Sequence, residues 1–159
     1  MKSKVFNGPY LNNHNAFVLI IIWLVLIFLF SNQSASGSSL LSSTIVNSIA
    51  PVAPVIIKSS LTFMIRKSAH IFLYFVLGIL IANLLASYKL KAKFVYVYSL
   101  MLVFAYAVTD EVHQLFVSGR SGEVRDILID TIAGALGIAL YLGLRRLYGT
   151  SKKTKNIVK

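Results

Sequence analysis

The chain is built from long uninterrupted apolar blocks separated by short polar segments. A soluble core would instead space its apolar residues every two to four positions along amphipathic elements. Positions 16–30, AFVLIIIWLVLIFLF, contain no polar side chain except the Trp23 indole and rise about 22 Å as a helix. Uncharged flanks extend this block toward spanning length. The pattern predicts membrane-spanning helices at about 16–33, 61–86, 94–117 and 126–147.

The first apolar block has a second interpretation, a cleaved signal peptide. Lys2 and Lys4 precede it, and the small residues SASGSS follow it. We favour a retained anchor, because the apolar run is at the upper limit for a signal-peptide core and the stretch before it is long. In either case the following segment begins outside the cell.

The serine-rich connection at 31–60 leaves two interpretations open. Leu41, Ile45 and Ile49 recur every four residues, which predicts a short helix on the membrane surface that ends near Pro51 and Pro54. An irregular polar loop is the alternative.

Composition supports a lipid environment. The chain is 57% hydrophobic and 13% charged, with a mean hydropathy of +0.75, whereas soluble domains are about 25% charged. We therefore expect an all-α polytopic membrane protein with one transmembrane domain at 16–147, between an N-terminal segment, 1–15, and a basic tail, 148–159. The absence of cysteine excludes disulfides and thiolate metal sites.

The charges predict an orientation. One side would carry cations only: Lys2, Lys4, Lys89, Lys91, Lys93, Arg145, Arg146, Lys152, Lys153, Lys155 and Lys159. The other would carry all five carboxylates with Lys58, Arg66, Lys67, Arg120 and Arg125. Since positive loops stay inside, we place both termini and the 89–93 loop in the cytoplasm. The net charge of +11 then reflects topology and anionic lipid, and we expect no nucleic-acid partner.

The five carboxylates fall within positions 110–130 and share one predicted membrane depth with three basic side chains. The acids are Asp110, Glu111, Glu123, Asp126 and Asp130; the bases are Arg66, Lys67 and His70. Charges at membrane depth are costly, so they turn inward and pair. We expect three helix faces to converge on one outward pocket, covered by the GRSG turn at 119–122.

Helical spacing assigns these faces. Arg66, His70 and Tyr74 recur every four residues, as do Asp126 and Asp130. On the third span, the spacing places Tyr106, Asp110, His113 and Gln114 together. We expect Asp130 to pair with Arg66, Arg120 or Arg125, Glu111 to face headgroups or pair with Lys67, and Glu123 to be a solvated loop residue.

Three functions fit such a pocket. In a binding site, arginine and lysine hold an anion while carboxylates orient them. The candidate ligand-binding residues are Arg66, Lys67, Glu111, Gln114, Arg120, Asp126 and Asp130. In an enzyme, His113 or His70 acts as general acid or base, Asp110 orients it, and Arg120 stabilises developing charge. In the third, the charges form only an architectural network.

A metal site is the weakest of the chemical interpretations. Asp110 and His113 could supply two ligands, with Asp126, Asp130 or His70 completing the set, but this rests on spacing alone. The sequence contains no HExxH pattern, Gly-rich phosphate loop or GxSxG elbow. We therefore predict no metal and no cofactor, and leave open whether the protein is an enzyme.

Three segments resemble the VanZ-like family of small bacterial membrane proteins. They are FLFSNQS, RKSAHIFLYFVLG and TDEVHQLFVSGRSGEVRDILIDTIAGALG. The turn departs from the family pattern, because Ser118 stands where relatives usually carry proline. The resemblance implies a multi-pass protein of the bacterial cytoplasmic membrane, in a family whose founding member is associated with teicoplanin resistance. It supplies no mechanism. The partners it implies are membrane lipids and an anionic envelope precursor or glycopeptide-related ligand, and the oligomeric state stays open.

Overall fold

The fold is described by a computed structural model that covers residues 12–33, 35–120 and 122–155. Its helices are α1 (Asn13–Ser31), α2 (Ala35–Ile49), α3 (Val55–Ser87), α4 (Ala92–Gln114) and α5 (Val124–Lys155). No strand occurs within these ranges, which confirms the all-α prediction. Four segments are long and apolar enough to cross a membrane: α1, α3, α4 and Val124–Tyr148 of α5.

The helices differ from the predicted spans at several ends, and α5 continues to Lys155, into the predicted basic tail. Two other differences are at the start of α3 and the end of α4. α3 begins at Val55 rather than near 61, because the helix starts directly after Pro54 and continues through the polar residues that follow. A helix of 33 residues is about 50 Å long, so α3 extends beyond a hydrocarbon core of about 30 Å. α4 ends at Gln114 rather than at 117, where the chain turns back toward α5.

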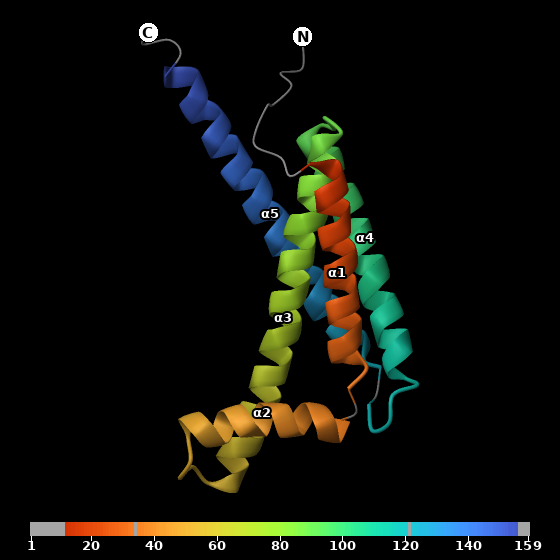
Figure 1. The fold of residues 1–159 in the computed structure, drawn as a ribbon, viewed down its shortest axis with the longest axis vertical. Helices are drawn as coiled ribbons and strands as arrows, with labels where there is room; N and C mark the ends of the chain where they lie inside the picture. Colours follow the sequence, from red (N-terminus) through yellow and green to blue (C-terminus); the bar gives the residue numbers. More distant parts are fainter. Residues whose placement is uncertain (1–11, 34, 121, 156–159) are drawn as a thin grey trace.

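The connection at 31–60 contains the helix α2, so the irregular-loop alternative is wrong, while the position of this helix on the membrane surface stays a prediction. Figure 1 shows α2 lying across the bundle, at the end opposite to the one where α5 finishes. Ser42 and Val46 are buried on α2, which contacts α3. Ile45 and Ile49, two residues of the predicted apolar stripe, are 44% and 68% exposed and lie free of the helix bundle. Leu41 lies among the residues whose side chains are not described.

The other four helices run up and down beside one another (Figure 1). α3 contacts every other helix and holds much of the buried core, including Tyr74 and Leu77. The start of α1, the α3–α4 connection and the end of α5 lie at one end of the bundle. The segment between α4 and α5 lies at the other. This grouping agrees with the separation of charges along the chain, while the assignment of membrane sides stays a prediction.

α3 and α5 approach each other at backbone distance through glycines. A Cβ added to Gly78 would lie 2.2 Å from the carbonyl oxygen of Gly134, and one added to Gly137 would lie 2.0 Å from that of Phe75. Small residues at such crossings allow membrane helices to pack closely. This contact brings the basic first half of α3 against the acidic start of α5.

α1 is attached to the bundle by two hydrogen bonds from aromatic side chains. The Trp23 indole donates to the carbonyl oxygen of Leu73 at 2.8 Å, and the Tyr106 hydroxyl donates to that of Leu24 at 2.7 Å. Both acceptors are helix carbonyls, so the bonds fix α1 against α3 and α4 without requiring a buried charge.

Candidate functional site

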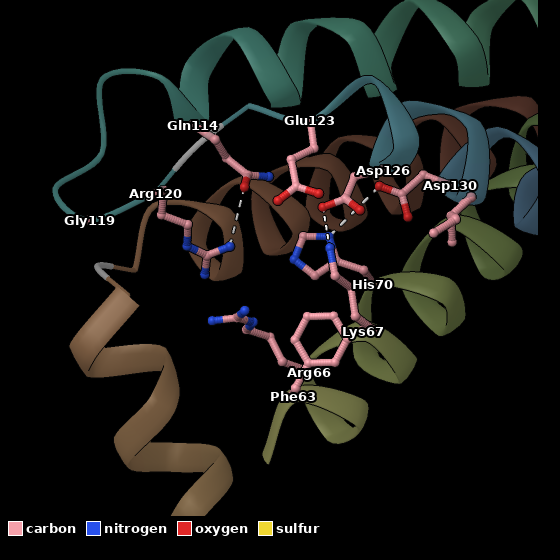
Figure 2. A pocket seen from close by; sticks show the side chains of 11 residues that line it. Phe63, Arg66, Lys67, His70, Gln114, Gly119, Arg120, Glu123, Asp126 and Asp130 are labelled. Carbon is pink, nitrogen blue, oxygen red and sulfur yellow. Dashed lines mark hydrogen bonds and ion pairs between the residues drawn. The ribbon is translucent and has the colours of Figure 1, made fainter. Parts of the chain in front are cut away.

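A cavity of about 100 Å³ lies between α3, the 115–123 connection and α5. It is lined by polar and charged side chains with two apolar ones: Phe63, Arg66, Lys67, His70, Gln114, Gly119, Arg120, Glu123, Asp126, Ile129 and Asp130. Figure 2 shows the basic side chains rising from α3 toward the carboxylates of α5. The expected convergence of distant polar segments therefore produces a cavity. Gly119 and Arg120 of the GRSG turn help to line it, while Ser121 lies outside the described residues.

Lys67 and Asp126 form the ion pair that closes one side of this cavity (Figure 2). Both side chains are partly buried, so the pair is less screened than a surface salt bridge. The Phe63 ring lies one turn earlier on α3, 5.7 Å from the Arg66 guanidinium carbon and 5.6 Å from the Lys67 nitrogen. Cations at such distances from an aromatic face are attracted to it.

Asp130 lies deeper and is 2% exposed. Its Oδ2 is 3.8 Å from His70 Nδ1, which corrects the expectation of an arginine partner. The physical reason is depth. About one turn of α5 separates Asp130 from Asp126, and about one turn of α3 separates His70 from Arg66. His70 therefore lies beside Asp130, whereas the Arg66 guanidinium lies on the side of Arg120 (Figure 2).

Arg120 is held by neutral oxygens. Gly119 adopts a positive φ of 74°, which turns the chain so that Arg120 enters the cavity wall. Its Nε donates to the Gln33 carbonyl at 3.1 Å, and its Nη1 donates to the Gln114 side-chain oxygen at 3.3 Å. Its Nη2 is buried and has no hydrogen-bond partner among the described residues.

Burial lowers the pKa of Arg120, and the nearby charge of Arg66 lowers this pKa further. The carboxylates of Asp110, Glu111 and Asp126 act in the opposite direction without outweighing these causes. Arg66 itself forms no hydrogen bond or ion pair with any residue that the structure describes. Figure 2 shows the two guanidinium groups facing the same space.

Glu111 supports the turn rather than lining the cavity. Its side chain is buried, and its Oε2 accepts the backbone N–H of Glu123 at 2.8 Å. Its Oε1 accepts the Gln114 amide at 3.1 Å. The expectation of a headgroup contact or a Lys67 pair is therefore wrong, because the chain folds back over Glu111 and uses both of its oxygens.

Asp110 is buried, with 4% exposure, and accepts a long hydrogen bond of 3.5 Å from Gln114. One potential ligand atom from each of His70, Asp110 and Asp130 lies within 4.8 Å of the other two. These residues come from α3, α4 and α5. Within the described part of the chain, these three residues form a group of histidine and aspartate side chains close enough together to hold a metal ion.

His113 faces a different way from Asp110. Its ring lies 4.6 Å from that of Phe28, and its Nε2 is 3.2 Å from the Asn32 side-chain oxygen. Tyr106 also contacts α1. The prediction that four residues of the third span share one face is therefore wrong. Tyr106 and His113 contact α1, while Asp110 and Gln114 face inward. Among the described residues, no hydrogen bond or ion pair joins Asp110 to His113.

At the rim of the cavity, Glu123 and Arg125 form an exposed pair at 2.8 Å, as expected for a solvated loop residue. The sequence-based candidates did not include Phe63, Ile129 or the Gln33 carbonyl. Phe63 lies three and four residues before Arg66 and Lys67, so helical spacing could have identified it. The Gln33 carbonyl acts through its backbone, and no pattern of side chains indicates that role.

Comparison with known proteins identifies a family. A family model described as VanZ/LLP1 matches residues 16–146. The match covers the four candidate spans except for residues 13–15 and 147–148, and it includes every residue that lines the cavity. No curated protein and no solved structure matches the chain.

Proposed function

The chain belongs to the VanZ/LLP1 family, and on that premise we propose that its cavity binds a phosphate-bearing or otherwise anionic component of the bacterial cell envelope. In this proposal the cavity opens on the outer side of the cytoplasmic membrane, an orientation that the distribution of positive charge along the sequence supports. Binding there makes teicoplanin-type glycopeptide antibiotics act less well, the effect that the resemblance to VanZ-like proteins implies.

One observation carries this proposal: Arg66 and Arg120 face one cavity, and neither has a carboxylate partner among the described residues. Two like charges held close together raise the free energy of the folded protein. An anion between them reverses the sign of that interaction, and guanidinium groups suit the planar, bidentate recognition of phosphate and carboxylate. The buried Nη2 of Arg120 supplies a donor without an acceptor.

The pattern of pairing argues against a purely architectural role. An architectural network would pair its cations, as it does for Lys67 with Asp126 and for Arg125 with Glu123. The two arginines that face the cavity are the exceptions. Neighbouring side chains then serve as supports: the Phe63 ring contacts the Arg66 guanidinium, and Gln114 accepts a hydrogen bond from Arg120.

The alternative is a hydrolase or transferase that acts on a lipid-linked, phosphate-bearing precursor with Asp110 and His113 as its acid–base pair. It has less support. His113 contacts α1 and does not line the cavity, so an acid–base pair with Asp110 lacks the required hydrogen bond. Conversion of a phosphorylated isoprenoid lipid by the purified protein would favour this alternative.

Anion binding is tested on the purified protein in lipid nanodiscs by calorimetric titration with inorganic phosphate and with a phosphorylated isoprenoid lipid. A charge-assisted hydrogen bond contributes about 1.5–3 kcal/mol, so Arg66→Gln and Arg120→Gln should each weaken binding by roughly 10- to 100-fold. Arg125→Gln is the matched control, because Arg125 does not line the cavity and its side chain is 66% exposed and paired with Glu123 at the rim. Equal binding by all three variants overturns the proposal.

The cellular consequence is measured as the teicoplanin inhibitory concentration of a susceptible bacterium that expresses each variant. Membrane abundance is quantified in parallel. The proposal expects Arg66→Gln and Arg120→Gln to lose protection at normal abundance and Arg125→Gln to keep it. Protection that falls only in step with abundance would assign the charges to folding.

A further inference from the structure

His70, Asp110 and Asp130 form a second cluster beneath the two arginines. Their ligand atoms lie within 4.8 Å of one another, and His70 Nδ1 is 3.8 Å from Asp130 Oδ2. The three residues come from three helices, so the bundle itself sets their spacing. We propose that this cluster binds a divalent transition-metal ion such as Zn²⁺ or Mn²⁺. The inference goes beyond the proposed anion binding, which rests on Arg66 and Arg120, although His70 and Asp130 line the same cavity.

The charge balance of the cluster supports a cation. Asp110 and Asp130 are 4% and 2% exposed, in a bundle that spans a membrane. Among the described residues, no lysine or arginine nitrogen lies within 4.0 Å of either carboxylate, and Lys67 is paired with Asp126. A buried carboxylate without a partner is costly. A single histidine does not compensate two such charges, whereas a divalent ion does.

A second, independent observation comes from Tyr74. It lies one turn after His70 on α3, is 0% exposed, and its hydroxyl has no hydrogen-bond partner among the described residues. The carboxylates of Asp110 and Asp130 are among the groups that interact electrostatically with it. Residues that ligate a metal are commonly held by an outer hydrogen bond. The Tyr74 hydroxyl is placed to donate such a bond to Asp110.

The ligand types restrict the ion. One imidazole and two carboxylates form a mixed nitrogen and oxygen set, which suits Zn²⁺ and Mn²⁺ better than Ca²⁺ or Cu⁺. Bonds of about 2.0–2.2 Å put neighbouring tetrahedral ligands about 3.5 Å apart. The His70–Asp130 spacing is close to that value, and the widest spacing must shrink by roughly 1 Å. Three protein ligands leave a further coordination position open.

His70 and Asp130 also line the cavity, so an open coordination position would face the space beneath Arg66 and Arg120. An anionic group held by the guanidiniums could then place an oxygen on the ion. The sequence analysis predicts no metal, because a set built on Asp110 and His113 and completed by Asp126, Asp130 or His70 rests on spacing alone. His113 faces α1, and His70 takes its place from another helix.

The test uses the full-length protein purified with chelator, reconstituted in nanodiscs, and titrated with Mn²⁺ or Zn²⁺ alone. Elemental analysis after desalting gives the stoichiometry, and the electron paramagnetic resonance of Mn²⁺ reports coordination directly. We expect one ion per chain. Asp110→Asn, Asp130→Asn and His70→Gln should each weaken binding by at least about tenfold.

Matched controls remove the same residue types at the same end of the bundle. Glu123→Gln removes a carboxylate and His113→Gln removes an imidazole, and both should keep the wild-type affinity. Because the three ligand variants change buried groups, their folding is checked by circular dichroism. The wild-type protein adds a readout independent of mutation, since an ion that binds only the folded state raises the melting temperature.

The outcomes separate this inference from the proposed function. No bound ion in the wild-type protein, or the same affinity in the ligand and control variants, overturns the metal site. Arg66→Gln and Arg120→Gln should bind the ion normally. If the protein binds the ion but not phosphate, only the anion site is refuted. If it binds phosphate normally but not the ion, only the metal site is refuted.

Discussion

Gly137 offers a quantitative test of the helix contact on which the cavity depends. A methyl group at this position would lie 2.0 Å from the Phe75 carbonyl oxygen, whereas real Cβ contacts essentially never fall below 3.0 Å. α3 and α5 would have to separate locally by about 1 Å, and the obstacle is backbone, which cannot rotate away. Gly143, six residues further along α5, has no atom within 4 Å of the equivalent methyl position and provides the matched control.

The two substitutions should therefore change stability in opposite directions. Overpacking costs about 1–3 kcal/mol and more where backbone must move, while replacing glycine with alanine inside a helix gains up to about 1 kcal/mol. We expect Gly137→Ala to lower the free energy of unfolding by about 2 kcal/mol. Gly143→Ala should leave it unchanged or raise it by up to about 1 kcal/mol.

The assay is reversible unfolding in detergent with increasing dodecyl sulfate, followed by the fluorescence of the single tryptophan. Trp23 donates to the Leu73 carbonyl and packs near Phe72 on α3, so its emission reports whether the bundle is intact. Equal stabilities for the two variants would refute the backbone contact between α3 and α5. The placement of Lys67 against Asp126 would then lose its structural basis.

Three further predictions concern the turn, the first helix and the topology. Glu111→Ala removes the acceptor of the Glu123 backbone N–H and the shorter of two bonds from the Gln114 amide, so it should cost about 1–3 kcal/mol and increase protease cleavage within 115–123. Trp23→Phe removes the hydrogen bond to Leu73 and should lower stability by about 0.5–1.5 kcal/mol, measured by circular dichroism during the same titration. The chain has no cysteine, so a single introduced cysteine can be labelled selectively. An impermeant maleimide should label Ser118→Cys in intact cells, and it should label Lys91→Cys only after the membrane is opened. The reverse pattern would refute the outward cavity.

The sequence predicts the spanning helices well because lipid imposes a strong and local constraint. Every backbone polar group inside a bilayer must be satisfied internally, so a long apolar block such as 16–30 has few alternatives to a helix. The interfacial segment at 31–60 is under no such constraint. Its sequence pattern is compatible with either a helix or a loop. In the structure it forms α2, which buries Ser42 and Val46 and contacts α3.

The candidate site is predicted in composition but not in pairing. Charge cost at membrane depth indicates that Arg66, Lys67, Asp126 and Asp130 should meet, and they do line one cavity. Spacing along a helix gives relative angles only to within a broad face. It could not show that His113 turns toward α1, since two residues of one face can contact different neighbouring helices.

The sequence by itself determines the class of protein, the number of candidate spans, the segregation of charge and the membership in a family, because each follows from local composition or from matching residues in order. The tertiary structure decides which charges remain without partners. That outcome depends on helix depth and on the 115–123 turn, which directs Glu111 to the backbone of Glu123 and Arg120 to neutral oxygens. Partner choice is a property of three-dimensional distance, so the unpaired arginines, and the cluster of His70, Asp110 and Asp130 beneath them, emerge only when three helices are packed together.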